Sequence, residues 1–147
     1  MSKIILRSLP VALIAVVAIA FAASRLHAID TSRSYVAYGV GQRNCEDYVK
    51  FREKKLDALE QQHPGYTKED LYEIVDRIVE QWIAGFLTAH NLYVSDTYDV
   101  VGKLTMDDLK ARLEKNCRAN ARQYFAEAMF ALAKELNPQR VKAVSGK

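Results

Sequence analysis

The clearest pattern along this chain is a run of apolar residues that recur every three or four positions. Its members are Leu71, Ile74, Val75, Ile78, Val79, Trp82, Ile83, Phe86 and Leu87. This spacing predicts an amphipathic helix with an apolar stripe of about four and a half turns. Residues 67–70 resemble a capping box in which Asp70 replaces the usual Glu or Gln, so we expect the helix to begin near Lys68 and to end near Asn91. We interpret its second half, residues 81–91, as a buried central segment.

Gly85 lies inside this helix, where a glycine costs about 1 kcal/mol relative to alanine. We expect the close approach of another helix backbone to offset that cost, with a bend of the helix as the alternative. The regular stripe is also compatible with a coiled-coil seam, but a single short helix of this kind more often packs into a core.

The same periodicity predicts three further helices. The first starts at Asn44, stops at His63-Pro64-Gly65 and has an apolar face formed by Cys45, Tyr48, Val49, Leu56 and Leu59. Another follows the cap signal at Thr105 and stacks Leu109, Leu113 and Cys117. After a break at residues 116–120, Asn120 is expected to cap the last helix, whose apolar face is Phe125, Ala128, Met129, Leu132, Ala133 and Leu136 and which ends at Asn137-Pro138.

These elements predict an all-α fold, a small four-helix domain that is orthogonal or bundle-like and spans residues 42–137. Residues 29–41 mix polar and aromatic residues without a period, so we expect a flexible arm there. Residues 92–104 read as a connector with one short extended piece. The basic residues 138–147 are expected to form a flexible tail.

Residues 1–28 have the pattern of a secretory signal peptide. Lys3 and Arg7 precede an apolar run over residues 11–23, and the small residues that follow fit cleavage after Ala22 or Ala28. The alternative is a retained membrane anchor, but the run is shorter than the roughly 20 residues that a spanning helix needs. We therefore expect a periplasmic protein that has no membrane partner after cleavage.

Loss of this segment would change the charge of the chain. The sequence has 21 basic and 18 acidic residues, and three of the basic ones, Lys3, Arg7 and Arg25, lie in the signal segment. The remainder is neutral, and no aromatic residues interleave with a basic stripe. This balance argues against a nucleic-acid partner.

Cys45 and Cys117 have one possible pairing, and an oxidising compartment would preserve the disulfide. Closing a loop of this length is worth on the order of 4 kcal/mol in the chain-entropy model. The alternative, a reactive thiol, would need a basic neighbour, and nothing in the sequence places His63 or His90 beside either cysteine.

We find no pattern for a catalytic, cofactor-binding or metal site. His63 and His90 are isolated, and no G-x-S-x-G motif occurs. Asp107 and Asp108 are better explained as negative charge at a helix N-terminus than as an acid–base pair. His90 is better explained as a half-buried packing residue than as a ligand. We therefore expect a protein that is not an enzyme and that needs no cofactor.

Four short segments occur in an order that is informative: residues 44–48 around the first cysteine, 83–91, 98–102, and 109–117 up to the second cysteine. Together they resemble the HdeA/HdeB family of periplasmic acid-stress chaperones. The charged section at residues 50–78 is longer here than in that family. A weaker resemblance links the chain to Rap1a-like immunity proteins, whose usual additional cysteines are missing here.

The first resemblance implies a protein that is folded and dimeric at neutral pH and that loosens in acid to expose apolar surface to unfolded clients. Below about pH 3 the remaining chain would carry a charge of roughly +20, which opposes the compact state, although most domains of this composition would also gain charge. We expect Trp82, Ile83, Phe86 and Leu87 to form the client surface. The alternative is an immunity or inhibitor protein that stays folded while it neutralises an exported toxin or enzyme.

Overall fold

The computed structural model describes residues 35–142, and the predicted signal segment and the last five residues lie outside this range. The elements are η1 (Gly39–Gln42), α2 (Cys45–Arg52), α3 (Asp57–Gln62), α4 (Lys68–Tyr93), α5 (Met106–Ala119), α6 (Phe125–Leu136) and η2 (Asn137–Gln139). The described part contains two isolated β-bridges and no strand. The predicted all-α class is therefore confirmed, with five α-helices within residues 35–142 in place of the four expected.

The long helix α4 begins where the sequence predicts. The Thr67 hydroxyl accepts a hydrogen bond from the backbone N–H of Asp70, and the Asp70 carboxylate accepts one from the N–H of Thr67. Thr105 and Asp108 form the same reciprocal cap at the start of α5. Aspartate thus replaces the usual glutamate in both capping boxes.

The predicted end of α4 is wrong by two residues, because the helix continues past Asn91 to Tyr93. The Asn91 side chain has another role: its Oδ1 accepts a hydrogen bond of 2.9 Å from the N–H of Val100. This bond fixes the connector that follows α4. None of the helices within residues 35–142 combines the length and apolar character that crossing a membrane requires.

The first predicted helix is broken in two. After α2 the backbone N–H of Lys55 donates to the carbonyl of Lys50, and Lys54 has a φ of 56°. These are the features of a Schellman ending, here without the usual glycine. The chain then turns, and Leu56 packs into the core before α3 begins at Asp57. Both halves carry apolar residues at helical spacing, so periodicity alone does not reveal the break.

The start of the last helix also differs from the prediction. Asn120 caps the end of α5, with its Nδ2 donating to the carbonyl of Asn116, while α6 begins at Phe125 after Tyr124. The N–H of Phe125 donates to the carbonyl of Arg43 over 2.8 Å. This bond joins the beginning of α6 to the segment that leads into α2.

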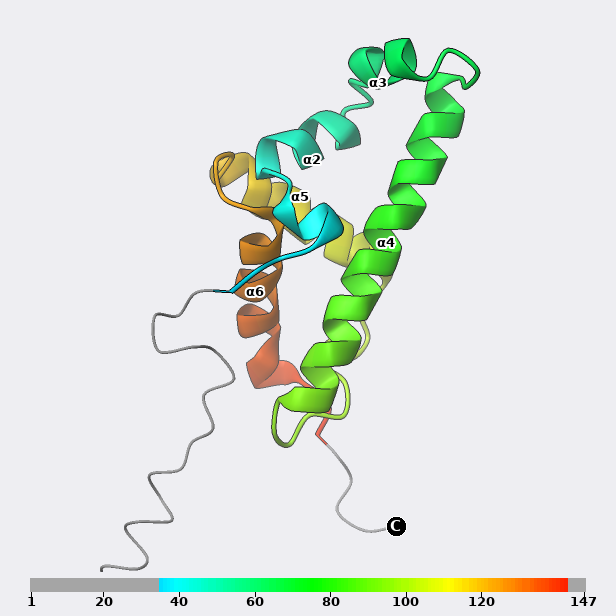
Figure 1. Ribbon diagram of the computed structural model, residues 1–147. Coiled ribbons are helices and arrows are strands. Elements are labelled where there is room, and N and C mark those ends of the chain that lie inside the picture. Colours follow the sequence, from blue (N-terminus) through cyan, green and yellow to red (C-terminus); the bar gives the residue numbers. More distant parts are fainter. Residues whose placement is uncertain (1–34, 143–147) are drawn as a thin grey trace, which may run out of the picture. The chain divides into compact units, whose positions relative to one another are not determined.

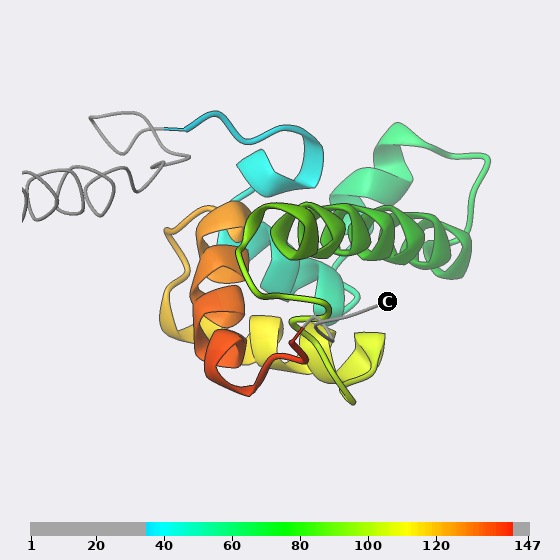
Figure 2. The same ribbon diagram turned by 90° about the horizontal axis from the view of Figure 1, so that it is seen from below.

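The core lies between α2, α4, α5 and α6. Its fully buried side chains include Ile83, Leu109, Leu113, Phe125 and Met129. The predicted disulfide between Cys45 and Cys117 is present, joins α2 to α5 with a Cα–Cα distance of 4.7 Å, and is fully buried. η1 packs against both α4 and α6, and α3 lies beside the first turns of α4 (Figures 1 and 2).

Both predicted flexible segments are partly incorporated into the fold. Residues 39–41 belong to η1, so the boundary expected at residue 42 is too late. At the other end, Val141 forms an antiparallel bridge with Asp99, and the Arg140 guanidinium donates to the carbonyl of Asp96. Residues 138–142 are therefore tied to the connector after α4, while residues 29–34 of the predicted arm and residues 143–147 of the predicted tail lie outside the described part.

Candidate functional site

The structure places the four predicted client-surface residues of α4 in two layers. Ile83 is completely buried and Leu87 is nearly so. Trp82 and Phe86 are partly buried, with ring centroids 5.9 Å apart, and Trp82 also packs 5.5 Å from Phe125. In the folded chain these four residues are core or its margin, so a client could reach most of this surface only after a rearrangement.

A short segment at residues 38–42, which we call the η1 strap, covers Trp82. The indole Nε1 of Trp82 donates a hydrogen bond of 2.8 Å to the carbonyl of Tyr38. Gly41 is buried against the same ring, and a Cβ at this position would collide with the indole Cζ2. Glycine is needed here because the backbone passes close to an aromatic face. The strap is therefore the cover of the predicted surface.

The role predicted for Gly85 is wrong. Within residues 35–142 no heavy atom beyond its own helix lies within 4 Å of a Cβ built at this position, so no second described helix approaches it. The close approach between a glycine and a neighbouring element occurs at Gly41 instead.

A buried charged cluster joins α4 to α5, and we call it the Lys110 cluster. Lys110 is 4% exposed, and its Nζ lies 2.9 Å from Asp76, 2.6 Å from Glu80 and 3.1 Å from Asp107. One cation thus faces three carboxylates. The Asp107 side chain reaches it from the solvent side, since it is 90% exposed.

A second cation extends the cluster toward α2. The Arg52 Nε donates to Glu114 over 3.2 Å, its Nη1 donates to the Tyr72 hydroxyl over 3.1 Å, and Nη1 lies 3.8 Å from Asp76. Glu114 is also held by Arg118 at 2.7 Å. Charged side chains from α2, α4 and α5 therefore converge beside the core.

The pKa values of this region reflect its burial and pairing. Burial opposes the charge of Lys110, but hydrogen bonds to Glu80, Asp76 and Asp107 outweigh it and raise the pKa of the ammonium above its usual value. Hydrogen bonds from Arg118 and Arg52 lower the pKa of Glu114. Lys110 and Glu114 are therefore held in their charged forms near neutral pH.

The Lys110 cluster was missed in the sequence, although a signal was present. Lys110 lies three and seven residues before Leu113 and Cys117, on the predicted apolar face of its helix. Asp76 has the same relation to Val79 and Ile83. A cation and an anion each placed on a buried stripe indicate a pair between two helices.

An apolar groove of about 510 Å³ opens between η1, α2, α3 and α4. Tyr48, Phe51, Val79 and Phe125 lie at its buried floor. Its remaining apolar lining residues are Val40, Leu56, Ala58, Leu59, Val75 and Ile78. Arg43, Asp47, Lys50, Lys55 and Gln62 complete the lining. We call this feature the α3–α4 groove.

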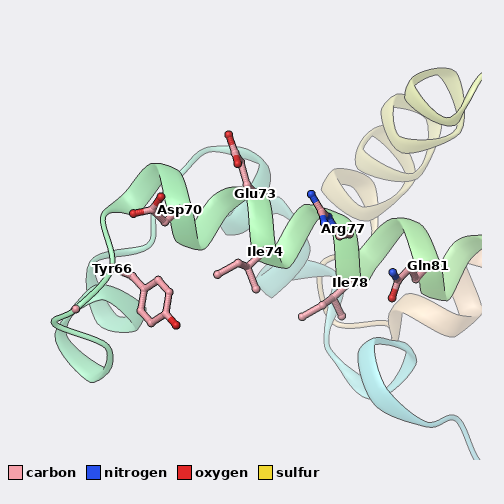
Figure 3. Close-up of a pocket in the computed structure, with 8 residues that line it drawn as sticks. Tyr66, Asp70, Glu73, Ile74, Arg77, Ile78 and Gln81 are labelled. Atoms are coloured by element: carbon pink, nitrogen blue, oxygen red, sulfur yellow. The ribbon is translucent and has the colours of Figure 1, made fainter.

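A second hollow of similar size lies along the first half of α4. Figure 3 shows Ile74 and Ile78 on the same side of the helix as the Tyr66 ring, with Glu73 and Arg77 on the opposite edge. Tyr66, Ile74 and Ile78 are about half exposed. Ile78 lines both hollows, so it forms the ridge between them.

His63 and His90 are the two histidines of the described part of the chain. Within residues 35–142 no group of three or more His, Cys, Asp or Glu side chains is placed to hold an ion. His90 is partly buried, its Nδ1 has no hydrogen-bond partner among the described residues, and burial together with Arg140 lowers its pKa. This agrees with the packing role expected for His90.

Comparison with protein-family models, with curated proteins and with solved structures found no significant match to this chain.

Proposed function

We propose that this chain is an exported, non-catalytic protein that binds the apolar segments of unfolded periplasmic proteins and does so when acid loosens its fold. The resemblance to HdeA-type chaperones suggested this function, and the Lys110 cluster is the observation that supports it most strongly. It supplies a means by which acid would weaken the contact between α4 and α5.

Acid would change the balance of charge in the Lys110 cluster. In strong acid carboxylates are protonated, while lysine and arginine stay charged. Lys110 would then be a buried cation without its counter-charges from Asp76, Glu80 and Asp107, and Arg52 would lose the charge of Glu114. A buried charge whose partner is removed costs roughly 3–5 kcal/mol, and less here because Glu80 and Asp107 reach solvent.

The surface that would be released is the stripe on α4. The η1 strap covers Trp82 through one hydrogen bond and the close contact with Gly41. The stripe also packs against α6, where Trp82 meets Phe125 and Phe86 meets Phe130. Exposure of Trp82, Ile83, Phe86 and Leu87 would therefore require α4 to separate from α6 as well as from α5 and the strap. The disulfide between Cys45 and Cys117 would keep α2 joined to α5 and limit the expansion of the chain.

A light-scattering assay tests this function. A periplasmic client that aggregates at pH 2.5 is diluted into acid with and without an equimolar amount of the purified chain. We expect suppression of aggregation at pH 2.5 and little effect at pH 7. The variant Trp82→Ser/Phe86→Ser should suppress less, whereas Ile74→Ser/Ile78→Ser, which removes apolar side chains that are already exposed, should act like wild type. Equal aggregation with and without the chain would refute the chaperone function.

A second candidate is a binding protein of the immunity or inhibitor kind that stays folded. The observation that favours it is the exposed apolar surface of Tyr66, Ile74 and Ile78, which is open without any rearrangement. This function requires a stoichiometric complex with one exported protein at neutral pH, detectable by size-exclusion chromatography with light scattering. Replacement of Ile74 and Ile78 by serine should then abolish the complex, whereas the same double variant is expected to act like wild type in the aggregation assay if the chain is a chaperone.

A further inference from the structure

We infer that the α3–α4 groove is a binding site for a single acyl chain with an anionic head group, of which a free long-chain carboxylate is the simplest case. This inference goes beyond the proposed function and does not depend on it, because the groove is open in the folded chain.

The groove gives direct access to the core. Phe51, Val79 and Phe125, which are at most 6% exposed, form its floor, and Leu59 and Val75 are partly buried on its sides. Ile78 stands at its mouth with 49% of its surface exposed. An apolar chain lying along this floor would remove the remaining exposed apolar surface from water, at about 25 cal/mol per Å² buried.

The size of the groove favours a small ligand over a protein segment. Its volume of about 510 Å³ lies within the range of small-molecule sites, which are mostly apolar with a few polar groups. Helix-in-groove recognition, by contrast, uses apolar anchors spread over two turns or more of an amphipathic helix.

The charges at the rim favour an anionic head group. Three cations, Arg43, Lys50 and Lys55, and one acid, Asp47, line the groove. Lys50 and Lys55 form exposed ion pairs with Glu46 and Glu53, which contribute little and can be exchanged for a ligand carboxylate. The Arg43 side chain makes no ion pair within the described part of the chain. Its guanidinium can hold a carboxylate through two parallel hydrogen bonds.

The test uses the full folded chain at pH 7.5 and a dansyl-labelled undecanoate as the fluorescent probe, displaced by laurate below its micelle concentration. We expect saturable binding of one laurate per chain and at least tenfold weaker displacement by dodecyltrimethylammonium, which has the same chain length and the opposite charge. Ile78→Glu places a charge in the mouth and should abolish binding. Ile74→Glu is the matched control, because Ile74 is equally exposed on the same helix but lies outside the groove.

A second pair of variants tests the head-group site. Arg43→Glu should weaken laurate by about five- to tenfold and reduce its preference over the ammonium amphiphile, whereas Lys134→Glu, on the exposed side of α6, should change neither. Far-ultraviolet circular dichroism of each variant checks its fold.

The inference is wrong if laurate does not saturate below micelle formation, if Ile74→Glu and Ile78→Glu lose binding equally, or if both amphiphiles bind equally well. Displacement of the probe by an apolar peptide but not by laurate would assign the groove to protein segments and would also overturn it. Failure of the aggregation assay leaves all these outcomes unaffected, so the two proposals are tested separately.

Discussion

The Nζ of Lys110 lies 2.9 Å from Oδ2 of Asp76, and this contact joins α5 to α4 at a point where the lysine is 4% exposed. Glu80 and Asp107 are the other two carboxylates around this Nζ. Arg52 lies next to them and pairs with Asp76 and Glu114. The Tyr48 hydroxyl donates a hydrogen bond to the backbone carbonyl of Lys110. A buried cation that depends on several carboxylates makes the stability of the helix pair depend on pH.

Replacement of Lys110 by methionine keeps the apolar stem of the side chain and removes the charge. At pH 7 three carboxylates lose their partner, and we expect a loss of about 2 kcal/mol, below the value for a fully buried pair because two of them reach solvent. Toward pH 3 carboxylates in general lose their charge, so the counter-charge around Lys110 falls in the wild type and the difference between the two proteins should shrink or reverse. Urea unfolding followed by circular dichroism at both pH values measures this.

Lys115→Met is the control for that experiment. Lys115 is exposed on the same helix and forms no ion pair within residues 35–142, so its replacement should change stability by less than about 0.5 kcal/mol at either pH. If Lys110→Met loses as much stability at pH 3 as at pH 7, the cluster does not control the response to acid.

Glu114→Gln tests the second part of the cluster. Hydrogen bonds from Arg118 and Arg52 lower the pKa of Glu114, so its charge stabilises the fold at pH values above the ordinary glutamate pKa of about 4.3. That stability is lost as pH falls through the lowered pKa of the folded state. We expect the variant to lose about 1 kcal/mol at pH 7 and nothing at pH 2, measured by chemical unfolding. An equal loss at both pH values would show that the charge of Glu114 is not responsible.

Two glycines should respond to alanine in opposite ways. Gly85→Ala adds a methyl group where space is open inside a helix, so we expect a gain of about 1 kcal/mol. Gly41→Ala places a Cβ against the indole of Trp82 and should displace the η1 strap, lower the stability and shift the Trp82 emission. Thermal unfolding and fluorescence of the two variants check this. A neutral Gly41→Ala would mean that the strap does not hold Trp82.

The disulfide should contribute a large share of the stability. Cys45 and Cys117 are 72 residues apart, and the chain-entropy model gives about 4 kcal/mol for a loop of this length. Cys45→Ala/Cys117→Ala is expected to lose about this amount in urea unfolding at pH 7. A loss below 1 kcal/mol would contradict it.

The sequence predicted those parts of the fold that local patterns determine. The starts of α4 and α5 follow from Thr67 and Thr105, whose caps involve residues three positions away, and the buried face of α6 follows from its period. The break after α2 was not predictable from the pattern, because Lys54 takes a left-handed conformation that its residue type does not favour.

The parts of the candidate site that were missed depend on contacts distant in the sequence. Trp82 donates to Tyr38, 44 residues away, and Lys110 pairs with Asp76, 34 residues away. A one-dimensional pattern shows that Trp82 is apolar and that Lys110 lies on a buried stripe, but not which residue covers the first or neutralises the second. The prediction for Gly85 was wrong for the same reason, because the sequence pattern does not show which elements lie near this glycine.

The most direct test of the account follows the fluorescence of Trp82, the single tryptophan of the chain, from pH 7 to pH 2 in the wild type and in Lys110→Met. We expect the wild-type emission to shift to longer wavelength as pH falls below 4, reversibly, and the shift in Lys110→Met to occur at lower pH or over a smaller range. Emission that stays unchanged down to pH 2, or identical transitions in the two proteins, would contradict the proposal that acid opens this fold through the Lys110 cluster.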